Sequence, residues 1–211
     1  MTTTSRRPRL NENVVLGLDA EVEKYVILGE ATGRKIADLR LIIGDDAIIR
    51  SGTVIYLGTR IGAGLRTGHN VVIREENLIG EGLQIWSNSV IDYGCRIGDH
   101  VKIHCNCYVA QFTVIEDDAF MAPGVIIAND MFPGKQFPEL PMQGPTIKRG
   151  AQIGCNCTLR PGVTIGEYSL IGAGSVVTKD IPARVIAYGN PARVVKRIED
   201  VTIATSSPKN P

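Results

Sequence analysis

The sequence has few aromatic residues and no excess of charge. Aromatic residues make up 5% of its 211 positions, and only one is Trp. The 23 Lys and Arg face 22 Asp and Glu, and the resulting net charge of +1 leaves no basic surface for nucleic acid. No run of about 18 apolar residues occurs, so a transmembrane helix is not expected. We therefore expect neither a nucleic-acid partner nor a membrane partner.

The sequence also lacks the marks of secretion. No apolar stretch follows the arginines near the amino terminus, as it would in a signal peptide. The five cysteines are an odd number, and reduced thiols in a cytoplasmic protein are the simplest interpretation. The spacings Cys105-x-Cys107 and Cys155-x-Cys157 resemble metal-binding pairs, but no second ligand pair is positioned beside them. We therefore expect no metal.

Glycine, in contrast, is abundant, and aliphatic residues recur at a fixed interval. The chain has 23 Gly. Aliphatic residues, with one Thr and one Met among them, occupy every sixth position through Ile43, Ile49, Ile55, Ile61, Thr67, Ile73, Ile79, Ile85, Ile91, Ile97, Ile103, Val109, Ile115, Met121 and Ile127. A second run in a shifted register comprises Ile147, Ile153, Leu159, Ile165, Ile171 and Val177. Gly, Asn, Asp or His stands at most positions three residues later, and these residues tolerate the positive φ of a corner. Each unit is therefore expected to be a short strand followed by a corner.

A longer rhythm predicts how the units stack. Gly44, Gly62, Gly80 and Gly98 follow one another at intervals of 18 residues, so three units complete one turn of a prism. Stacked turns about 4.8 Å apart would satisfy one another's backbone hydrogen bonds and bury columns of Ile. The repeat thus predicts an all-β parallel β-helix solenoid over residues 43–184. Its handedness does not follow from these counts.

Two segments interrupt or precede the repeat. Residues 1–42 are expected to form an amino-terminal arm, with irregular opening strands at 14–16 and 26–28 and with disorder over 2–10. Residues 128–146 carry four prolines and separate the two runs, so they are expected to leave the prism as a protruding loop. Long loops on a rigid scaffold often carry function.

The carboxy-terminal segment, residues 185–211, follows the repeat. Asn190-Pro191 fits an N-cap with Pro in the first helical turn, which predicts a short helix over 192–201 that closes the open end of the core. The polar stretch 205–211 is expected to be a disordered tail.

One stretch carries a resemblance to a known family. Ile171-Gly-Ala-Gly-Ser-Val-Val-Thr-Lys-Asp-Ile-Pro, continued by Ala187-Tyr-Gly-Asn-Pro-Ala-Arg, resembles the carboxy-terminal signature of the hexapeptide-repeat acyltransferases that transfer acetyl from acetyl-CoA to sugars. The resemblance implies a left-handed parallel β-helix, a homotrimer, and acetyl-CoA in the cleft between neighbouring prisms. It further implies pantetheine contacts from Ala173, Thr178 and Lys179, phosphate contacts from Arg193 and Lys196, and a CoA contact at Cys155.

The protruding loop indicates the acceptor. Sugar O-acetyltransferases of this family carry a catalytic His on the loop, but residues 128–146 contain none. Asn129-Asp130-Met-Phe-Pro is instead similar to members that acetylate the amine of a nucleotide-linked amino sugar. Asp130 would then orient the ammonium, and Asn129 would hold the substrate or the thioester carbonyl. The alternative is that Asn129 and Asp130 serve only the turn.

The histidines support rival interpretations. His100 is expected to be a structural corner residue. His69 and His104 are candidate site residues, so a sugar O-acetyltransferase with either as general base is the main alternative. A γ-type carbonic anhydrase would need three imidazoles around zinc, but the residue two turns above His69 is Cys105. A further alternative is a non-enzymatic scaffold that has lost its substrate site, and failure to bind CoA would favour it. Trp86 is expected to be exposed, either in a subunit contact or stacked on a base.

Overall fold

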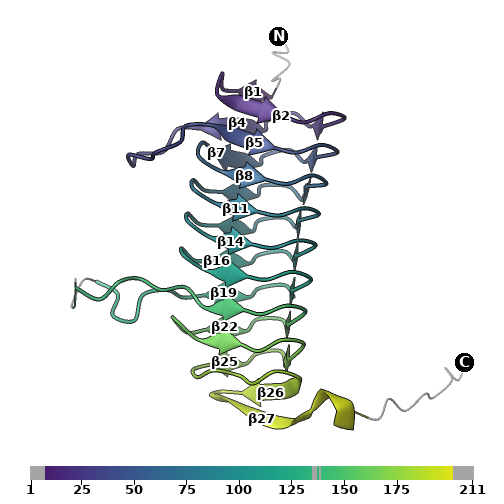
Figure 1. The fold of residues 1–211 in the computed structure, drawn as a ribbon, viewed down its shortest axis with the longest axis vertical. Coiled ribbons are helices and arrows are strands. Elements are labelled where there is room, and N and C mark those ends of the chain that lie inside the picture. Colours follow the sequence, from purple (N-terminus) through teal and green to yellow (C-terminus); the bar gives the residue numbers. More distant parts are fainter. Residues whose placement is uncertain (1–7, 135–136, 138, 202–211) are drawn as a thin grey trace, which may run out of the picture.

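The computed structural model of the protein describes residues 8–134, 137 and 139–201. Short parallel strands stack into a three-sided prism, with one strand of each turn on each face (Figure 1). Face A consists of β1 (Arg9–Leu10), β4 (Ile27–Glu30), β7 (Val54–Tyr56), β10 (Val72–Ile73), β13 (Val90–Ile91), β16 (Tyr108–Val109), β19 (Ile126–Ile127), β22 (Thr158–Leu159) and β25 (Val176–Val177). The predicted parallel β-helix is therefore confirmed.

Faces B and C complete each turn. Face B consists of β2 (Val14–Leu16), β5 (Leu41–Ile43), β8 (Arg60–Ile61), β11 (Leu78–Ile79), β14 (Arg96–Ile97), β17 (Val114–Ile115), β20 (Thr146–Ile147) and β23 (Thr164–Ile165). Face C consists of β3 (Glu21–Val22), β6 (Ile48–Ile49), β9 (Arg66–Thr67), β12 (Gln84–Ile85), β15 (Lys102–Ile103), β18 (Phe120–Met121), β21 (Gln152–Ile153), β24 (Leu170–Ile171), β26 (Val185–Gly189) and β27 (Ala192–Arg197). We name each edge by the two faces that meet there.

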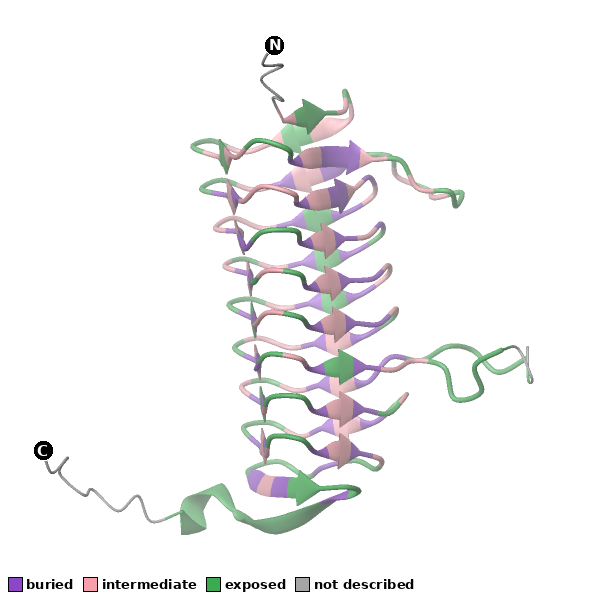
Figure 2. Cartoon of the chain, turned by 180° about the vertical axis from the view of Figure 1, so that it is seen from behind, coloured by how far each residue is buried: buried purple, intermediate pink, exposed green. Residues whose placement is uncertain are grey.

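The core is the axis of the prism. The repeated aliphatic residue of each unit is buried, as at Ile55, Ile73 and Ile91, while the residue before it is less buried. Figure 2 shows buried and less buried positions alternating along the strands. Strands alternate their side chains between the two sides, so a two-residue strand needs only one apolar residue. Small residues such as Ala47 and Cys95 fill a second buried column.

The corners behave as their residue types predict. Asn70 and His100 have φ values of 57° and 56°, which confirms His100 as a corner residue. The glycine rhythm has a separate cause at the B–C edge. A Cβ on Gly44 would lie 2.6 Å from the backbone nitrogen of Ala63 in the next turn, and one on Gly62 would lie 2.8 Å from that of Glu81. The glycines therefore allow adjacent turns to approach.

The solenoid begins earlier than the sequence predicts. Arg9 pairs with Ile27 and Val14 pairs with Leu41, so the supposed arm already forms turns of the prism. The expected disorder over 2–10 is wrong for the last two of these residues, which form β1, and residues 1–7 lie outside the described residues. The chain between β4 and β5 leaves the A–B edge as a projecting loop (Figure 1), and this insertion hides the register of the first turns.

The helix expected over 192–201 is not formed. Residues Ala192–Arg197 form β27, which pairs antiparallel with β26, and only a 3₁₀ turn, η1 (Ile198–Asp200), follows. The end of face C offers unpaired backbone groups, and β-branched Val194 and Val195 suit a strand that satisfies them. The expected disordered tail, 205–211, lies outside the described residues.

Candidate functional site at the A–B edge

The A–B edge gathers several of the predicted site residues. The chain leaves β19 at Asn129 to form the loop between β19 and β20, which projects on the same side as the loop between β4 and β5 (Figure 1). β22 neighbours β19, and β25 neighbours β22. Thr178 and Lys179 therefore follow Asn129 along one edge, two turns away, or roughly 10 Å at the spacing of parallel strands.

Asn129 and Asp130 have different surroundings. The backbone N–H of Gln143 donates to the carbonyl of Asn129 at 2.8 Å and closes the base of the loop. An open pocket of about 230 Å³ is lined by Asn129, Met131, Leu140, Pro141, Gln143 and Pro161. Asp130 lines a different pocket, of about 640 Å³, and its Oδ1 accepts the backbone N–H of Phe132 at 2.9 Å. Turn chemistry thus applies to Asp130, while Asn129 lies beside the base of the loop.

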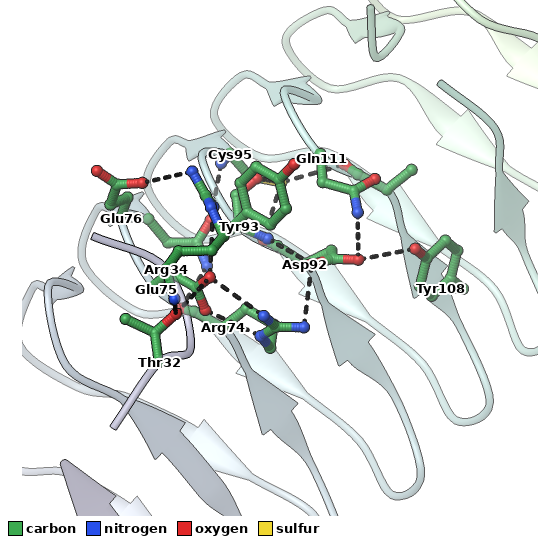
Figure 3. Close-up of polar contacts among 12 residues, drawn as sticks. Thr32, Arg34, Arg74, Glu75, Glu76, Asp92, Tyr93, Cys95, Tyr108 and Gln111 are labelled. Atoms are coloured by element: carbon green, nitrogen blue, oxygen red, sulfur yellow. Dashed lines mark hydrogen bonds and ion pairs between the residues drawn. The ribbon is translucent and has the colours of Figure 1, made fainter. Parts of the chain in front are cut away.

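A chain of polar contacts continues from Asn129 along the edge. Figure 3 shows its contacts among Gln111, Asp92 and Tyr108. Asn129 Nδ2 donates to Gln111 Oε1 at 2.6 Å, and Gln111 Nε2 donates to Asp92 Oδ2 at 2.7 Å. The Tyr108 hydroxyl donates to the same Asp92 oxygen at 2.8 Å. Burial, together with this hydrogen bond to Asp92, raises the pKa of Tyr108 to about 12. The tyrosine hydroxyl therefore remains a donor.

The other end of this polar chain holds the loop between β4 and β5 in place, because Arg74 lies next to both Asp92 and Glu75. Arg34 in that loop donates to Glu75 Oε1 at 3.3 Å and lies 3.6 Å from the ring centroid of Tyr93 (Figure 3). Glu75 is buried and also accepts from Arg74 Nε at 2.9 Å and from Thr32 Oγ1 at 3.0 Å. Burial raises the pKa of Glu75, but the hydrogen bonds from Arg74 and Thr32 outweigh it and lower the pKa overall.

The opposite end of the edge carries the basic residues expected to meet CoA. An open pocket of about 250 Å³ is lined by Lys179, Asp180, Ile181, Ala192, Arg193 and Val194. Lys196 lies farther along β27, paired with Ile186. One link joins this end to the loop, because Arg160 approaches the Met131 sulfur at 2.9 Å and donates to the Thr178 carbonyl at 3.5 Å.

The remaining predicted site residues lie on the C–A edge. The backbone carbonyl of Cys155 accepts the N–H of Gly174 at 2.7 Å, which places Cys155 and Ala173 on adjacent turns. The His104 ring lies between Trp86 and Phe120, with centroid distances of 6.4 and 5.4 Å. In a single chain, this set is separated from Asn129 by the width of face A.

His69 has polar neighbours of its own on the C–A edge. Its Nδ1 is 3.0 Å from Ser51 Oγ and 3.9 Å from a Glu23 carboxylate oxygen. The half-exposed indole of Trp86 agrees with the expected outward orientation.

The cysteines divide into buried and accessible groups. Cys95, Cys107 and Cys157 are buried, as core filling requires, and Cys155 is exposed. Burial raises the pKa of Cys95 to about 12. Within the described ranges, no three His, Cys, Asp or Glu side chains group as metal ligands would. The part of the chain that the structure describes contains no helix long and apolar enough to cross a membrane.

Sequence reasoning missed the polar chain between the two loops. A signal was present, because Arg74 and Asp92 directly follow the buried Ile73 and Ile91 and so face outward one turn apart with opposite charges. The contact between Gln111 and Asn129 had no such signal, because Asn129 lies where the loop departs from the repeat.

Comparison with known proteins finds the same six-residue repeat that forms the prism. The profile of the bacterial transferase hexapeptide family (six repeats) matches residues 78–111, 94–129 and 144–179. The galactoside O-acetyltransferase of Escherichia coli is 42% identical over 99 residues, which is 44% of this chain and 48% of that enzyme. The dTDP-3-amino-3,6-dideoxy-alpha-D-galactopyranose 3-N-acetyltransferase of Aneurinibacillus thermoaerophilus is 58% identical over 48 residues, 23% of this chain and 25% of that enzyme. The chain thus spans between a quarter and about half of the length of these two relatives.

Solved structures share the fold over nearly the whole chain. The UDP-N-acetylglucosamine acyltransferase of Bacteroides fragilis superposes with a TM-score of 0.74 at 19% identity, covering 92% of this chain and 74% of that one. The Campylobacter jejuni enzyme of the same name gives 0.63 at 19% identity, covering 90% and 73%. The chain is therefore similar to the hexapeptide-repeat transferases over residues 78–129 and 144–179, and its solenoid is the left-handed parallel β-helix that the resemblance implied.

Proposed function

We propose that the protein is an acetyl-CoA-dependent N-acetyltransferase that acts on the amino group of a nucleotide-linked amino sugar. The observation that carries this proposal is the chemistry of the loop edge. Residues 128–146 contain no histidine, and Asn129, beside the pocket at the base of the loop, is held by another amide. A neutral amine needs orientation beside the thioester more than it needs a general base. The likeness to the amino-sugar 3-N-acetyltransferase supports the same choice.

The reaction is a direct acyl transfer. The amine lone pair attacks the thioester carbonyl, the C–N bond forms, and the C–S bond breaks to release the CoA thiolate. The proton lost by the amine nitrogen neutralises the thiolate or passes to water. Thr178 and Lys179 would contact the pantetheine, and Asn129 would contact the acceptor along the same edge.

The proposal includes a homotrimer. Cys155 and Ala173 lie on the C–A edge, whereas Lys179 and Arg193 lie near the A–B edge. Both sets can meet one CoA molecule only if the C–A edge of one copy faces the A–B edge of another. Arg193 and Lys196 would then meet the CoA phosphates, since cationic side chains pair well with phosphate. In this proposal, acetyl-CoA is the acyl-donor substrate, and the reaction takes place in the cytoplasm.

The second candidate is a sugar O-acetyltransferase. The 42% identity to the galactoside enzyme favours it, and so does the outward position of His104 beside Trp86. A hydroxyl must lose its proton as it attacks, so this reaction needs His69 or His104 as the base. In a trimer, either histidine would be supplied by the neighbouring copy.

Mass spectrometry with matched acceptors separates the candidates. The purified protein is incubated with acetyl-CoA and with nucleotide sugars that differ only by an amine or a hydroxyl at one carbon. The N-acetyltransferase proposal expects an acetylated amino sugar and free CoA, and expects this product to persist in a His69→Ala/His104→Ala variant. Product from the hydroxyl sugar alone, abolished in that variant, would establish the O-acetyltransferase.

A further inference from the structure

Asp92 is the anchor of the polar chain that ends at Asn129. The residue is only 7% exposed, and each of its carboxylate oxygens accepts a hydrogen bond. Oδ1 accepts the backbone N–H of Tyr93 at 2.8 Å and lies 3.8 Å from Arg74 NH1. Oδ2 accepts from Tyr108 and from Gln111 (Figure 3). A carboxylate among donors accepts hydrogen bonds only, so the group that faces it must be a donor.

This requirement orients two amides in turn. Gln111 must direct its NH₂ group at Asp92, so its carbonyl oxygen points at Asn129. Asn129 must then direct its own NH₂ group at Gln111, where it lies 2.6 Å from Oε1 and 3.5 Å from the backbone carbonyl. The same nitrogen is 3.6 Å from the Met142 sulfur. The donor and acceptor pattern alone fixes the orientation of both amides.

The consequence is a free hydrogen-bond acceptor beside the loop pocket. Among the described residues, none donates a hydrogen bond to Asn129 Oδ1, and Asn129 lines the pocket of about 230 Å³. A carbonyl oxygen at this point suits a ligand that offers an N–H. Such an oxygen can accept one N–H of an amine and leave the lone pair of the nitrogen free to attack. An amide oxygen is too weak a base to take the proton of a hydroxyl.

We propose that Asp92 and Gln111 are positioning residues that fix the side-chain amide of Asn129 so that its carbonyl oxygen faces the acceptor amine. The inference rests on the proposed N-acetyltransferase function and adds the residues that select an amine. In the reaction, Asn129 Oδ1 holds one N–H as the C–N bond forms and the C–S bond breaks. It also stabilises the positive charge that develops on the nitrogen.

The direction of the hydrogen bonds between residues 92, 111 and 129 can be reversed by moving the carboxylate from position 92 to position 129. In Asp92→Asn, the new amide can donate to Gln111, which lets both downstream amides turn over and directs the NH₂ group of Asn129 outward. We expect kcat for the amino sugar to fall about a hundredfold, with KM for acetyl-CoA unchanged. In the double variant Asp92→Asn/Asn129→Asp, Gln111 donates to the new carboxylate, and an acceptor faces the pocket again. We expect kcat to recover at least tenfold, or about 1.4 kcal/mol in activation free energy.

A purely structural role would not produce this rescue. The matched control is Asp99→Asn, at the B–C edge, where Asp99 Oδ1 accepts the backbone N–H of Glu81 at 2.8 Å; its kcat is expected to equal that of the wild type. If Asp92→Asn does not fold, Gln111→Met interrupts the chain and leaves Asp92 its contacts with Tyr93 and Tyr108. The same loss of kcat is then expected.

The outcomes separate the inference from the function on which it rests. Wild-type kcat in Asp92→Asn or Gln111→Met would overturn the positioning role, as would a double variant no faster than Asp92→Asn. An equal loss in Asp99→Asn would also overturn it. A wild-type protein that acetylates no amine overturns the proposed function itself, before any variant is compared.

Discussion

Replacing Ile127 by Ala should show how much one inward residue contributes to the solenoid. Ile127 is 1% exposed, whereas its neighbour Ile126 faces outward from the same strand and is 43% exposed. The substitution removes three carbons, and burial of each contributes about 0.8 kcal/mol. A cavity adds to this loss where the surroundings cannot collapse. Leu159 in the next turn is held in register by the parallel pairing of β19 with β22, so collapse is restricted.

We therefore expect Ile127→Ala to lower the free energy of unfolding by about 3–4 kcal/mol, and Ile126→Ala by less than about 1 kcal/mol. Denaturant unfolding at one fixed protein concentration measures both, and the m-value should stay the same. Equal losses in the two variants would refute the reasoning, because inward and outward positions would then contribute alike. So would a loss below about 1 kcal/mol in Ile127→Ala, which would mean that the stack relaxes freely around a missing side chain.

Three further expectations follow from single residues. Glu75→Gln should lower the free energy of unfolding by about 3 kcal/mol at pH 7, because it leaves two arginines beside a neutral group. The pKa of Glu75 lies below its ordinary value of 4.5, so the free energy of unfolding of the wild type should fall as the pH drops from about 5 through that lowered pKa. The variant should lack this part of the pH dependence. In native protein, an alkylating reagent should label the exposed Cys155 and leave Cys95 unlabelled until unfolding, and CoA should slow the labelling of Cys155; labelling unaffected by saturating CoA would contradict the proposed contact. At the corner residue Asn106, with φ 59°, Asn106→Ala should cost about 1 kcal/mol in thermal unfolding and Asn106→Gly nearly nothing, and equal costs would contradict a conformational cause.

The prism was predictable from the repeat, because each unit marks its inward position with an aliphatic residue and its corner with a residue that tolerates positive φ. The same local logic failed wherever long-range pairing decides the structure. The insertion between β4 and β5 shifts the register, so the repeat does not reveal the adjacent turns that contain Arg9 and Ile27. The stretch Ala192–Arg197 follows a plausible helix start, but pairing with β26 at the end of face C determines its conformation. Propensity is a weak prior against such pairing.

The candidate site was predictable to a similar extent. Asn129 and the carboxy-terminal signature were visible as motifs, and the structure brings Asn129, Thr178 and Lys179 onto one edge. The contact of Gln111 with Asn129 depends on how the loop leaves the prism, and no periodic pattern encodes it. The contact of Arg34 with Glu75 joins an insertion to the repeat and was hidden for the same reason.

The central claim is that acyl transfer takes place at the A–B edge. The most direct test is a crystal structure of the protein with CoA and a nucleotide-linked amino sugar. We expect the pantetheine to run along Thr178 and Lys179, and the sugar amine to lie within hydrogen-bond distance of Asn129 Oδ1. A sugar bound against His69 or His104, with Asn129 facing only solvent, would contradict the account.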